Sequence, residues 1–367
     1  MLIKKIDLVN YRNYTNLSLP LAEGINIFLG QNAQGKTNVL EAVYYTALTH
    51  SHRTKSDDDL IGRDASESSI MLLMDRHSVE NEINIKLYRQ KTRQIFLSGQ
   101  KIKAKDLIGT LNVVLFSPED LFLIKGAPQG RRRFLDAEIS QANPRYFNDL
   151  MIYNRLLQQR NALLKKIREK KASRDMLFEW DFQLAELAAK VVKKRLSSIE
   201  KLNELAGMMQ RRLSGNSETL SVVYQIHGTN SLLEEELVSW YNKRLRESVE
   251  LDILRGYTSV GPQRDDLVFS VNGDDLKTFG SQGQQRTGIL ALKLAELEFL
   301  HIETGDYPIL LLDDVMSELD SGRRNELLEF VLNEKIQTLI TATEKAYFPE
   351  EYLTSYYKVE KGIISKQ

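Results

Sequence analysis

Apolar and polar residues alternate with a period of two in the early part of the chain. A strand is predicted over Leu2 to Asn10, and the alternation is longest from Ile70 to Leu97. Ser98 and Gly99 supply a turn at the end of the second stretch. We therefore expect an antiparallel meander in this part.

Uninterrupted apolar segments predict a second kind of strand, one that is buried on both faces of a parallel sheet. These segments are Ile25 to Leu29, Leu111 to Phe116, Ile309 to Leu312 and Thr338 to Ile340. A helix-like run covers Val39 to Leu48, and a long apolar helix is predicted over Thr287 to Leu300. The two ends of the chain therefore predict an α/β domain.

The middle of the chain has a helical period. It extends from Pro144 to about Leu213, with a second helix predicted over Phe178 to Leu205. A strand over Leu220 to Ile226 and a helical stretch over Leu232 to Leu251 follow, and the composition shifts at Gly256. Because no long heptad run is present, we expect packed helices and no extended coiled coil.

Composition narrows the classes of protein that fit this pattern. The 367 residues contain 42% hydrophobic and 27% charged residues, as in an ordinary globular protein of about two domains. Fifty basic residues balance fifty acidic ones, so net charge does not indicate a nucleic-acid partner. The chain has no cysteine, which excludes disulfides and thiolate metal sites, and no apolar run approaches a membrane span. We expect a cytoplasmic protein.

The segment from Gly30 to Asn38 fits the G-x-x-x-x-G-K-[ST] pattern of a phosphate-binding loop. It follows an apolar strand and precedes a helix, as that loop requires. Gly30 and Gly35 allow backbone N–H groups to surround phosphates, Lys36 adds a positive charge, and the Thr37 hydroxyl can bind Mg²⁺. The predicted nucleotide-binding residues are Gly30, Gln31, Asn32, Ala33, Gln34, Gly35, Lys36, Thr37 and Asn38. Arg12 is either a solvated surface charge or a further contact to the nucleotide.

Two later segments carry candidate chemistry. Asp313 and Asp314 end a strand predicted to be buried, where an α/β sheet places its site. In a phosphate-loop protein the first would hold Mg²⁺ and the second would orient the attacking water. Ser281 and Gln284 form a capping box at the start of a helix, and the helix-weakening Gly283 between them suits a close approach by a phosphate or another backbone.

Basic residues cluster in the helical part. Arg131 and Arg132 stand near the start of a helix, where nearby acids such as Asp136 and Glu138 or an external anion must offset them. Further along, Arg155, Lys165 and Lys166 lie among the helical residues. They form either a solvated outer face or a surface for a nucleic-acid backbone.

In this order, these segments resemble the ABC-type ATPase head of the chromosome-maintenance and Rad50 group. Four segments are similar in sequence to the RecF family of bacterial recombination mediators: Asn10 to Tyr14, Phe116 to Leu121, Arg131 to Asp136 and Gly261 to Leu267. The resemblance implies an α/β ATPase head, lobe I, over residues 1–118 and 256–367. It also implies a mainly helical lobe II over residues 119–255, without a long coiled coil.

The resemblance also implies a mechanism. Two heads would dimerise and enclose two ATP molecules with Mg²⁺, so that Ser281, Gly283 and Gln284 of one subunit meet the phosphate held by Lys36 of the other, with Asp320 in the D-loop. The family binds DNA without sequence specificity and works with RecO and RecR to load RecA at gaps. It acts in repair and in the restart of replication.

The chain departs from the ABC pattern at several positions. Ser117 to Glu119 contains no lobe-linking glutamine, Thr343 stands in place of the switch histidine, and Asp314 replaces a glutamate. Gln263 stands where relatives usually have histidine. A shorter carboxylate and no histidine predict slow hydrolysis that serves as a switch.

Two other functions fit parts of the pattern. The nucleotide-binding subunit of a transporter would usually have the glutamine loop and the switch histidine. A small nucleotide or phosphoryl kinase would need only the phosphate loop, and the segment around Ser281 would then have no role in binding nucleotide.

Overall fold

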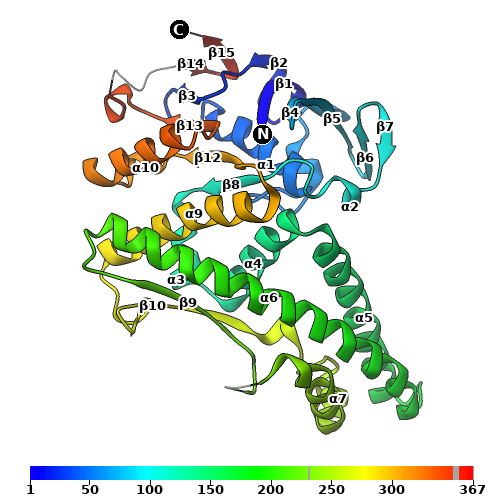
Figure 1. The fold of residues 1–367 in the computed structure, drawn as a ribbon. Helices are drawn as coiled ribbons and strands as arrows, with labels where there is room; N and C mark the ends of the chain where they lie inside the picture. Colours follow the sequence, from blue (N-terminus) through cyan, green and yellow to red (C-terminus); the bar gives the residue numbers. More distant parts are fainter. Residues whose placement is uncertain (230–231, 350–354, 367) are drawn as a thin grey trace. The chain divides into compact units, whose positions relative to one another are not determined.

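A computed structural model describes residues 1–229, 232–349 and 355–366, which form two compact units (Figure 1). Unit 1 comprises Met1–Leu121 and Ile289–Gln367, and unit 2 comprises Phe122–Gly288. The first boundary falls close to the predicted residue 118. The second was placed wrongly at residue 256, because strand β10 (Asp266–Val271) pairs with β9 (Leu220–Gln225) and so belongs to unit 2.

The first sheet of unit 1 is antiparallel, with strand order β2-β1-β4-β5-β6-β7. Its strands are β1 (Leu2–Tyr11), β2 (Tyr14–Pro20), β4 (Glu67–Arg76), β5 (Val79–Tyr88), β6 (Lys91–Leu97) and β7 (Gln100–Ile102). The predicted meander is therefore confirmed by the consecutive pairs β4 with β5 and β5 with β6. Ser98 and Gly99 form the turn to β7, both with positive φ.

The second sheet of unit 1 has the order β15-β14-β3-β13-β12-β8 and is parallel except for β15. Its strands are β3 (Ile25–Leu29), β8 (Val113–Phe116), β12 (Ile309–Asp313), β13 (Thr338–Ala342), β14 (Ser355–Glu360) and β15 (Ile363–Lys366). Every residue of β12 and β13 is buried. This burial explains why the strands read as uninterrupted apolar runs.

Helix α1 (Lys36–Leu48) connects the two sheets of unit 1. It contacts β4 of the antiparallel sheet and β8, β12 and β13 of the parallel sheet. Contact on both sides explains its buried residues, which include Val39, Leu40 and Tyr45. The other helices of unit 1 are α2 (Ala104–Leu107), α10 (Ser321–Asn333) and the part of α9 (Gln282–Thr304) from Ile289 onward.

Unit 2 is mainly helical. Its helices are α3 (Leu121–Lys125), α4 (Pro128–Ala142), α5 (Pro144–Arg168), α6 (Leu177–Leu213), α7 (Leu237–Glu247) and α8 (Val249–Arg255), with the start of α9. A small sheet has the order β11-β10-β9, with β11 at Asp274–Asp275. The predicted helical stretch Leu232 to Leu251 contains α7, which ends at Glu247, and the start of α8 at Val249.

Buried arginines tie the helices of unit 2 together. Arg160 of α5 is fully buried and binds Asp181 of α6 at 2.6 Å and Asp252 of α8 at 2.8 Å. Arg195 of α6 binds Asp136 of α4 at 2.8 Å. Part of the positive charge in the helical sequence is therefore internal, because charges this deeply buried require paired partners.

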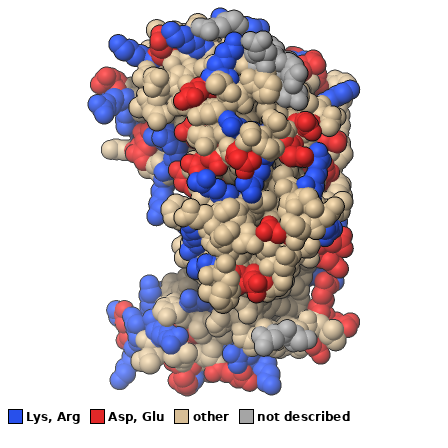
Figure 2. All heavy atoms as spheres, turned by 90° about the vertical axis from the view of Figure 1, so that its left-hand side faces the viewer, with Lys and Arg blue, Asp and Glu red and all other residues tan. Residues whose placement is uncertain are grey.

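The surface of the molecule carries both signs of charge. Figure 2 shows lysines and arginines interspersed with aspartates and glutamates on the face that it presents. This mixture agrees with fifty basic and fifty acidic residues in the sequence. Within the ranges that the structure describes, no helix combines the length and apolar character needed to cross a membrane.

Candidate nucleotide-binding site

The phosphate loop lies at the carboxyl edge of the parallel sheet. β13 pairs with β3 on one side and with β12 on the other, so the loop after β3 and the acidic end of β12 meet at the same edge. The Thr37 hydroxyl donates to Asp313 Oδ1 at 2.8 Å, and the Thr341 hydroxyl donates to the same oxygen at 2.7 Å. Two residues predicted to bind Mg²⁺, 276 positions apart in the sequence, are thus in direct contact.

Two glycines of the loop are required by close contacts. Gly35 has φ of 112°, and a Cβ there would lie 2.5 Å from Asn13 Nδ2. A Cβ on Gly30 would lie 2.4 Å from the carbonyl oxygen of Val359 in β14. Any side chain at these positions would displace the loop.

Lys36 is the first residue of α1, and its ammonium group reaches back across the loop. Its Nζ donates to the carbonyl oxygens of Gly30 at 2.5 Å and Gln31 at 3.0 Å. Burial lowers the pKa of Lys36, and the charges of Asp314 and Asp313 oppose that shift. A cation beside a loop of backbone N–H groups is the arrangement that binds the terminal phosphates of a nucleotide.

Asp314 follows Asp313 with a left-handed backbone, at φ of 55°. Its N–H donates to the Thr341 hydroxyl at 2.9 Å, which fixes its backbone beside Asp313. Burial raises the pKa of Asp314, with Lys36 acting in the opposite direction. Its carboxyl is therefore partly withdrawn from water at the carboxyl edge of the sheet.

The middle of the phosphate loop is held from outside. The Gln34 carbonyl accepts hydrogen bonds from Asn13 Nδ2 at 3.0 Å and from the Gly362 N–H at 3.2 Å. The Tyr14 hydroxyl donates to the Gly35 carbonyl at 3.0 Å. The turns after β1 and after β14 thus fix the loop that the sequence predicts to bind phosphate.

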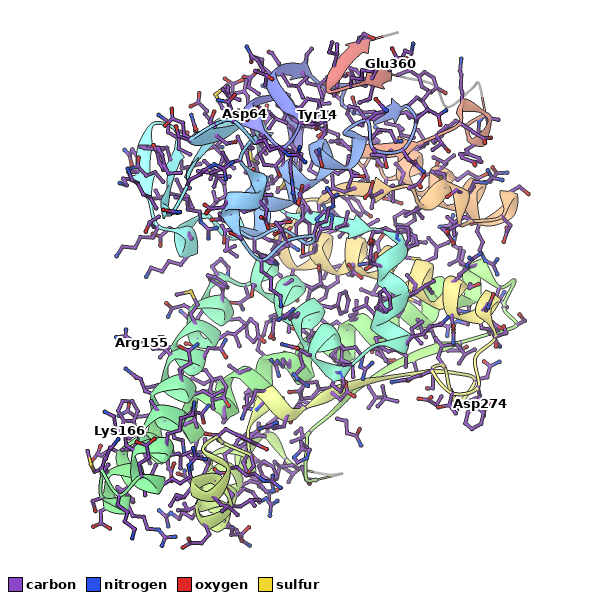
Figure 3. The ribbon with its side chains drawn as sticks, turned by 180° about the vertical axis from the view of Figure 1, so that it is seen from behind. Tyr14, Asp64, Arg155, Lys166, Asp274 and Glu360 are labelled. Atoms are coloured by element: carbon purple, nitrogen blue, oxygen red, sulfur yellow. The ribbon has the colours of Figure 1, made fainter. Side chains whose placement is uncertain are left out.

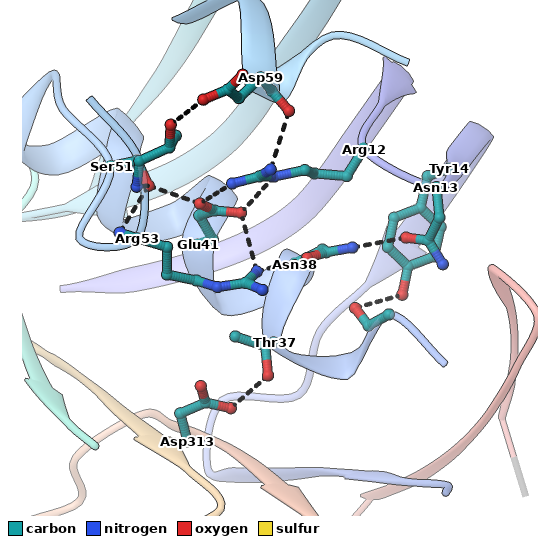
Figure 4. A network of polar contacts seen from close by, with 12 residues as sticks. Arg12, Asn13, Tyr14, Thr37, Asn38, Glu41, Ser51, Arg53, Asp59 and Asp313 are labelled. Carbon is teal, nitrogen blue, oxygen red and sulfur yellow. Dashed lines mark hydrogen bonds and ion pairs between the residues drawn. The ribbon is translucent and has the colours of Figure 1, made fainter. Parts of the chain in front are cut away.

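Arg12 is neither a freely solvated charge nor unpaired (Figure 4). It donates to both carboxylate oxygens of Glu41 on α1, at 2.9 Å and 2.6 Å, and to the Asp59 carbonyl. Arg53 joins this network by donating to Asn38 Oδ1 at 2.8 Å. Burial would raise the pKa of Glu41, but hydrogen bonds from Arg12 and Ser51 outweigh it and hold the pKa below its ordinary value. Arg12 as a contact to the nucleotide stays a prediction.

Sequence reasoning missed several residues of this region. Asn13, Tyr14, Glu41 and Arg53 support the loop or its helix. Asn13 and Tyr14 lie in the segment that carries the family resemblance, but that resemblance gave them no role. Thr341 had a signal, because it follows an apolar strand and could have been expected beside Asp313.

The other predicted residues lie outside this cluster. Ser281, Gly283 and Gln284 stand together at the start of α9 in unit 2, where the predicted capping box is confirmed. Asp320 is the N-cap of α10 and accepts from the Arg323 N–H at 3.0 Å. Thr343 follows β13.

The predicted DNA-binding arginines of α4, Arg131 and Arg132, bind groups of unit 2 itself. Arg131 is 5% exposed and binds both oxygens of Asp266 in β10, at 2.7 Å and 2.8 Å. Its guanidinium is therefore paired inside unit 2, and the prediction that Arg131 contacts DNA is wrong. Arg132 is partly buried and donates to the Asp265 carbonyl at 2.7 Å. The sequence predicted that nearby acids such as Asp136 and Glu138, or an external anion, offset these arginines. The direct partners are Asp266 in β10 and the residue before it, Asp265, and the charge of Asp136 also acts on Arg132.

Arg155, Lys165 and Lys166 of α5 are exposed. Figure 3 shows Arg155 and Lys166 on this helix with their side chains directed to solvent. These three residues therefore remain available to a phosphate backbone.

Comparisons with known proteins agree with this geometry. The sequence pattern described as RecF/RecN/SMC N terminal domain matches residues 2–365. The chain belongs to this family. The DNA replication and repair protein RecF of Lachnoclostridium phytofermentans is 42% identical over 369 residues, covering 100% of both chains. The protein of the same name from Clostridium beijerinckii is 44% identical over 342 residues, covering 93% of this chain and 91% of the relative.

Solved structures confirm the predicted ABC-type ATPase head. A structure of the recombination mediator protein RecF-ATP in the RecFOR pathway is 36% identical, with a TM-score of 0.92 over 100% of this chain and 97% of the other. An Smc head bound to a winged-helix domain of ScpA shares the fold, with a TM-score of 0.59 at 13% identity over 100% of this chain and 97% of the other.

Proposed function

We propose that this protein is an ATP-dependent DNA clamp, which dimerises around two ATP molecules and acts in recombinational repair and replication restart. The observation that carries the proposal is the contact of Thr37 with Asp313, 2.8 Å long, beside Lys36 in a phosphate loop. The RecF-ATP structure, similar over the whole chain, supports ATP as the nucleotide.

Thr37 and Asp313 would hold Mg²⁺. A hydroxyl and a carboxylate oxygen at this separation fit an ion that takes few protein ligands and completes its shell with phosphates and water. When bound, the ion neutralises charge on the phosphates. Lys36 binds and orients the terminal phosphate, and Asp314 accepts a hydrogen bond from the attacking water. The side chain of Asp314 is shorter than the usual glutamate, which supports slow hydrolysis that serves as a switch.

The start of α9 supports a site shared between two subunits. Ser281 and Gly283 are exposed, and a Cβ on Gly283 would meet only Ser281 Oγ, at 3.9 Å. Among the described residues, the N–H groups of Gln282 and Gly283 have no acceptor. This helix end can therefore approach a phosphate held by Lys36 of a second copy, where its N–H groups and dipole favour negative charge. Asp320 would lie in the D-loop at the same interface.

DNA binding would use exposed positive charge on α5. Arg155, Lys165 and Lys166 supply this charge without any arrangement that reads bases, so we expect binding to the backbone without sequence specificity. The RecFOR pathway named for the solved relatives supports RecO and RecR as partners. Together these proteins would load RecA at gaps.

The test is the mass of the protein in solution, measured by size-exclusion chromatography with light scattering. With ATP and Mg²⁺ the wild-type chain should double in mass, and a junction DNA should co-elute with the dimer. K36R should remain a monomer because it removes the compact ammonium that the loop surrounds. A K36R variant that still dimerises on ATP would contradict the clamp.

A further inference from the structure

The start of α9 is held by more than its own capping box. The Ser281 N–H donates to Gln284 Oε1 at 2.9 Å, and the Gln284 N–H donates to Ser281 Oγ at 3.2 Å. The remaining polar atom of the Gln284 side chain, Nε2, donates to Glu218 Oε1 at 3.0 Å. Glu218 lies between α6 and β9, 66 positions earlier in the chain.

Glu218 is itself fixed in place. Its second carboxylate oxygen accepts from Gln210 Nε2 of α6 at 2.8 Å, and the Gln210 side chain is fully buried. The Glu218 N–H donates to Ser214 Oγ at 3.0 Å. The next residue, Thr219, donates its N–H to Asn272 Oδ1 at 2.9 Å, which fastens the loop to the turn between β10 and β11. The carboxylate is thus held before any ligand binds.

The groups on the two sides of the Gln284 amide, the Glu218 carboxylate and the Ser281 N–H, select one orientation of that amide. An ionised carboxylate only accepts hydrogen bonds, so Glu218 requires the amide nitrogen of Gln284 to face it. The amide oxygen must then face the Ser281 N–H, as the capping box needs. Glu218 therefore sets the direction of the side chain that closes the cap.

A helix that begins with this sequence needs such support. Gly283 stands in the first turn of α9, where glycine loosens a helix, and a Cβ there would meet only one atom within 4 Å. Donors that act on a developing charge are effective when their geometry is fixed beforehand. An anchor outside the helix can supply that rigidity while the face at Gly283 stays open.

We propose that Glu218 is a positioning residue for the shared ATP site, acting through Gln284 on the start of α9 and linking it to α6. The inference rests on the proposed function, in which this helix end meets the phosphate bound by a second copy. Glu218 lies behind the capping box and does not touch the nucleotide. Its effect should therefore appear in ATP-driven association and hydrolysis but not in the binding of ATP to a monomer.

The first experiment compares E218A with E204A, a matched change at an exposed glutamate of α6. Binding of a fluorescent ATP analogue to monomers should be equal for both variants and wild type. ATP-driven dimerisation and hydrolysis should fall about ten- to a hundredfold in E218A, the effect of losing one charge-assisted hydrogen bond. If wild type dimerises with ATP and E218A behaves like E204A, the inference is wrong.

The second experiment exchanges the two groups. Q284E keeps the capping box but sets two carboxylates against each other, so association should weaken. Adding E218Q restores a donor and an acceptor between the two positions and should recover most of the loss. Failure of the double variant to exceed Q284E would overturn the route through Gln284. Failure of wild type to dimerise would instead contradict the proposed function.

Discussion

At Gly35 the backbone conformation and the space around it both exclude a side chain. The φ of 112° disfavours other residues, and Asn13 occupies the place of a Cβ. G35A should therefore abolish binding of ATP, because the loop cannot keep its N–H groups turned inward. Gly305 offers a matched control, since it has φ of 79° but nothing within 4 Å of a Cβ. G305A should cost about 1 kcal/mol of stability and leave the affinity for ATP unchanged, as measured by calorimetry. Equal affinities for both variants would refute this account of the loop.

Glu41 makes a prediction about pH. Its side chain is fully buried and binds Arg12 at 2.6 Å, and its pKa lies below the ordinary 4.5. E41Q should lower the free energy of unfolding by about 3 kcal/mol at neutral pH, since it leaves Arg12 without its charge partner. A lowered folded-state pKa gives stability that is complete above the unfolded value and is lost as pH falls through the folded value. The difference from wild type should therefore shrink below pH 4.5.

Urea unfolding at neutral and acidic pH measures this difference. E329Q, at an exposed glutamate of α10, is the control and should match wild type at every pH. A penalty for E41Q that stays constant down to acid unfolding would show that the ion pair is not its cause.

Helix α5 carries buried and exposed arginines, which the sequence pattern does not distinguish. Arg160 is buried between Asp181 and Asp252, whereas Arg155 is exposed. R160A should destabilise the protein by about 3 to 5 kcal/mol, because two buried carboxylates lose their partner. R155A should change stability by less than about 0.5 kcal/mol. Denaturant unfolding distinguishes them, and equal stabilities would contradict the buried network.

The exposed residues of α5 should matter for DNA binding and not for stability. R155E with K166E should weaken binding and flatten the dependence of log K on log salt, because each lost phosphate contact removes a slope of about 0.9 on duplex DNA. K101E with K105E, at exposed lysines of unit 1, is the control with the same change of charge. Fluorescence anisotropy with a labelled junction measures both. Equal slopes for the two double variants would rule out α5 as the DNA surface.

Elements whose signal is local were predictable from the sequence. The buried strands β12 and β13 appear as apolar runs, and the capping box of α9 is contained in four residues. The contact of Thr37 with Asp313, 276 positions apart, was predictable because both residues were assigned to one Mg²⁺ site. Contacts between distant residues without such shared chemistry were not predictable. The boundary at residue 256 was wrong because the pairing of β10 with β9 has no local marker. Arg131 was assigned to DNA because its partner, Asp266, lies 135 positions away.

At the scale of the whole molecule, the central claim is that one ATP site is built from two copies of the chain. Lys36 belongs to unit 1 and Ser281 to unit 2. In a symmetric dimer, each site would take Lys36 from one subunit and Ser281 from the other. K36R and S281R should then be inactive for different reasons, the first failing to hold the phosphate correctly and the second blocking its approach to α9.

Mixing these two variants tests the claim most directly. A mixed dimer has one site in which both residues are native and one in which both are changed. Complete pairing into mixed dimers would restore about half of the wild-type ATPase rate, so an equal mixture should regain a rate up to that value. The rate of ATP hydrolysis is measured for each variant alone and for the mixture, with ATP binding by S281R checked separately. Recovery in the mixture alone is the predicted result. An active S281R variant, or no recovery when both variants are folded, would contradict a site shared between subunits.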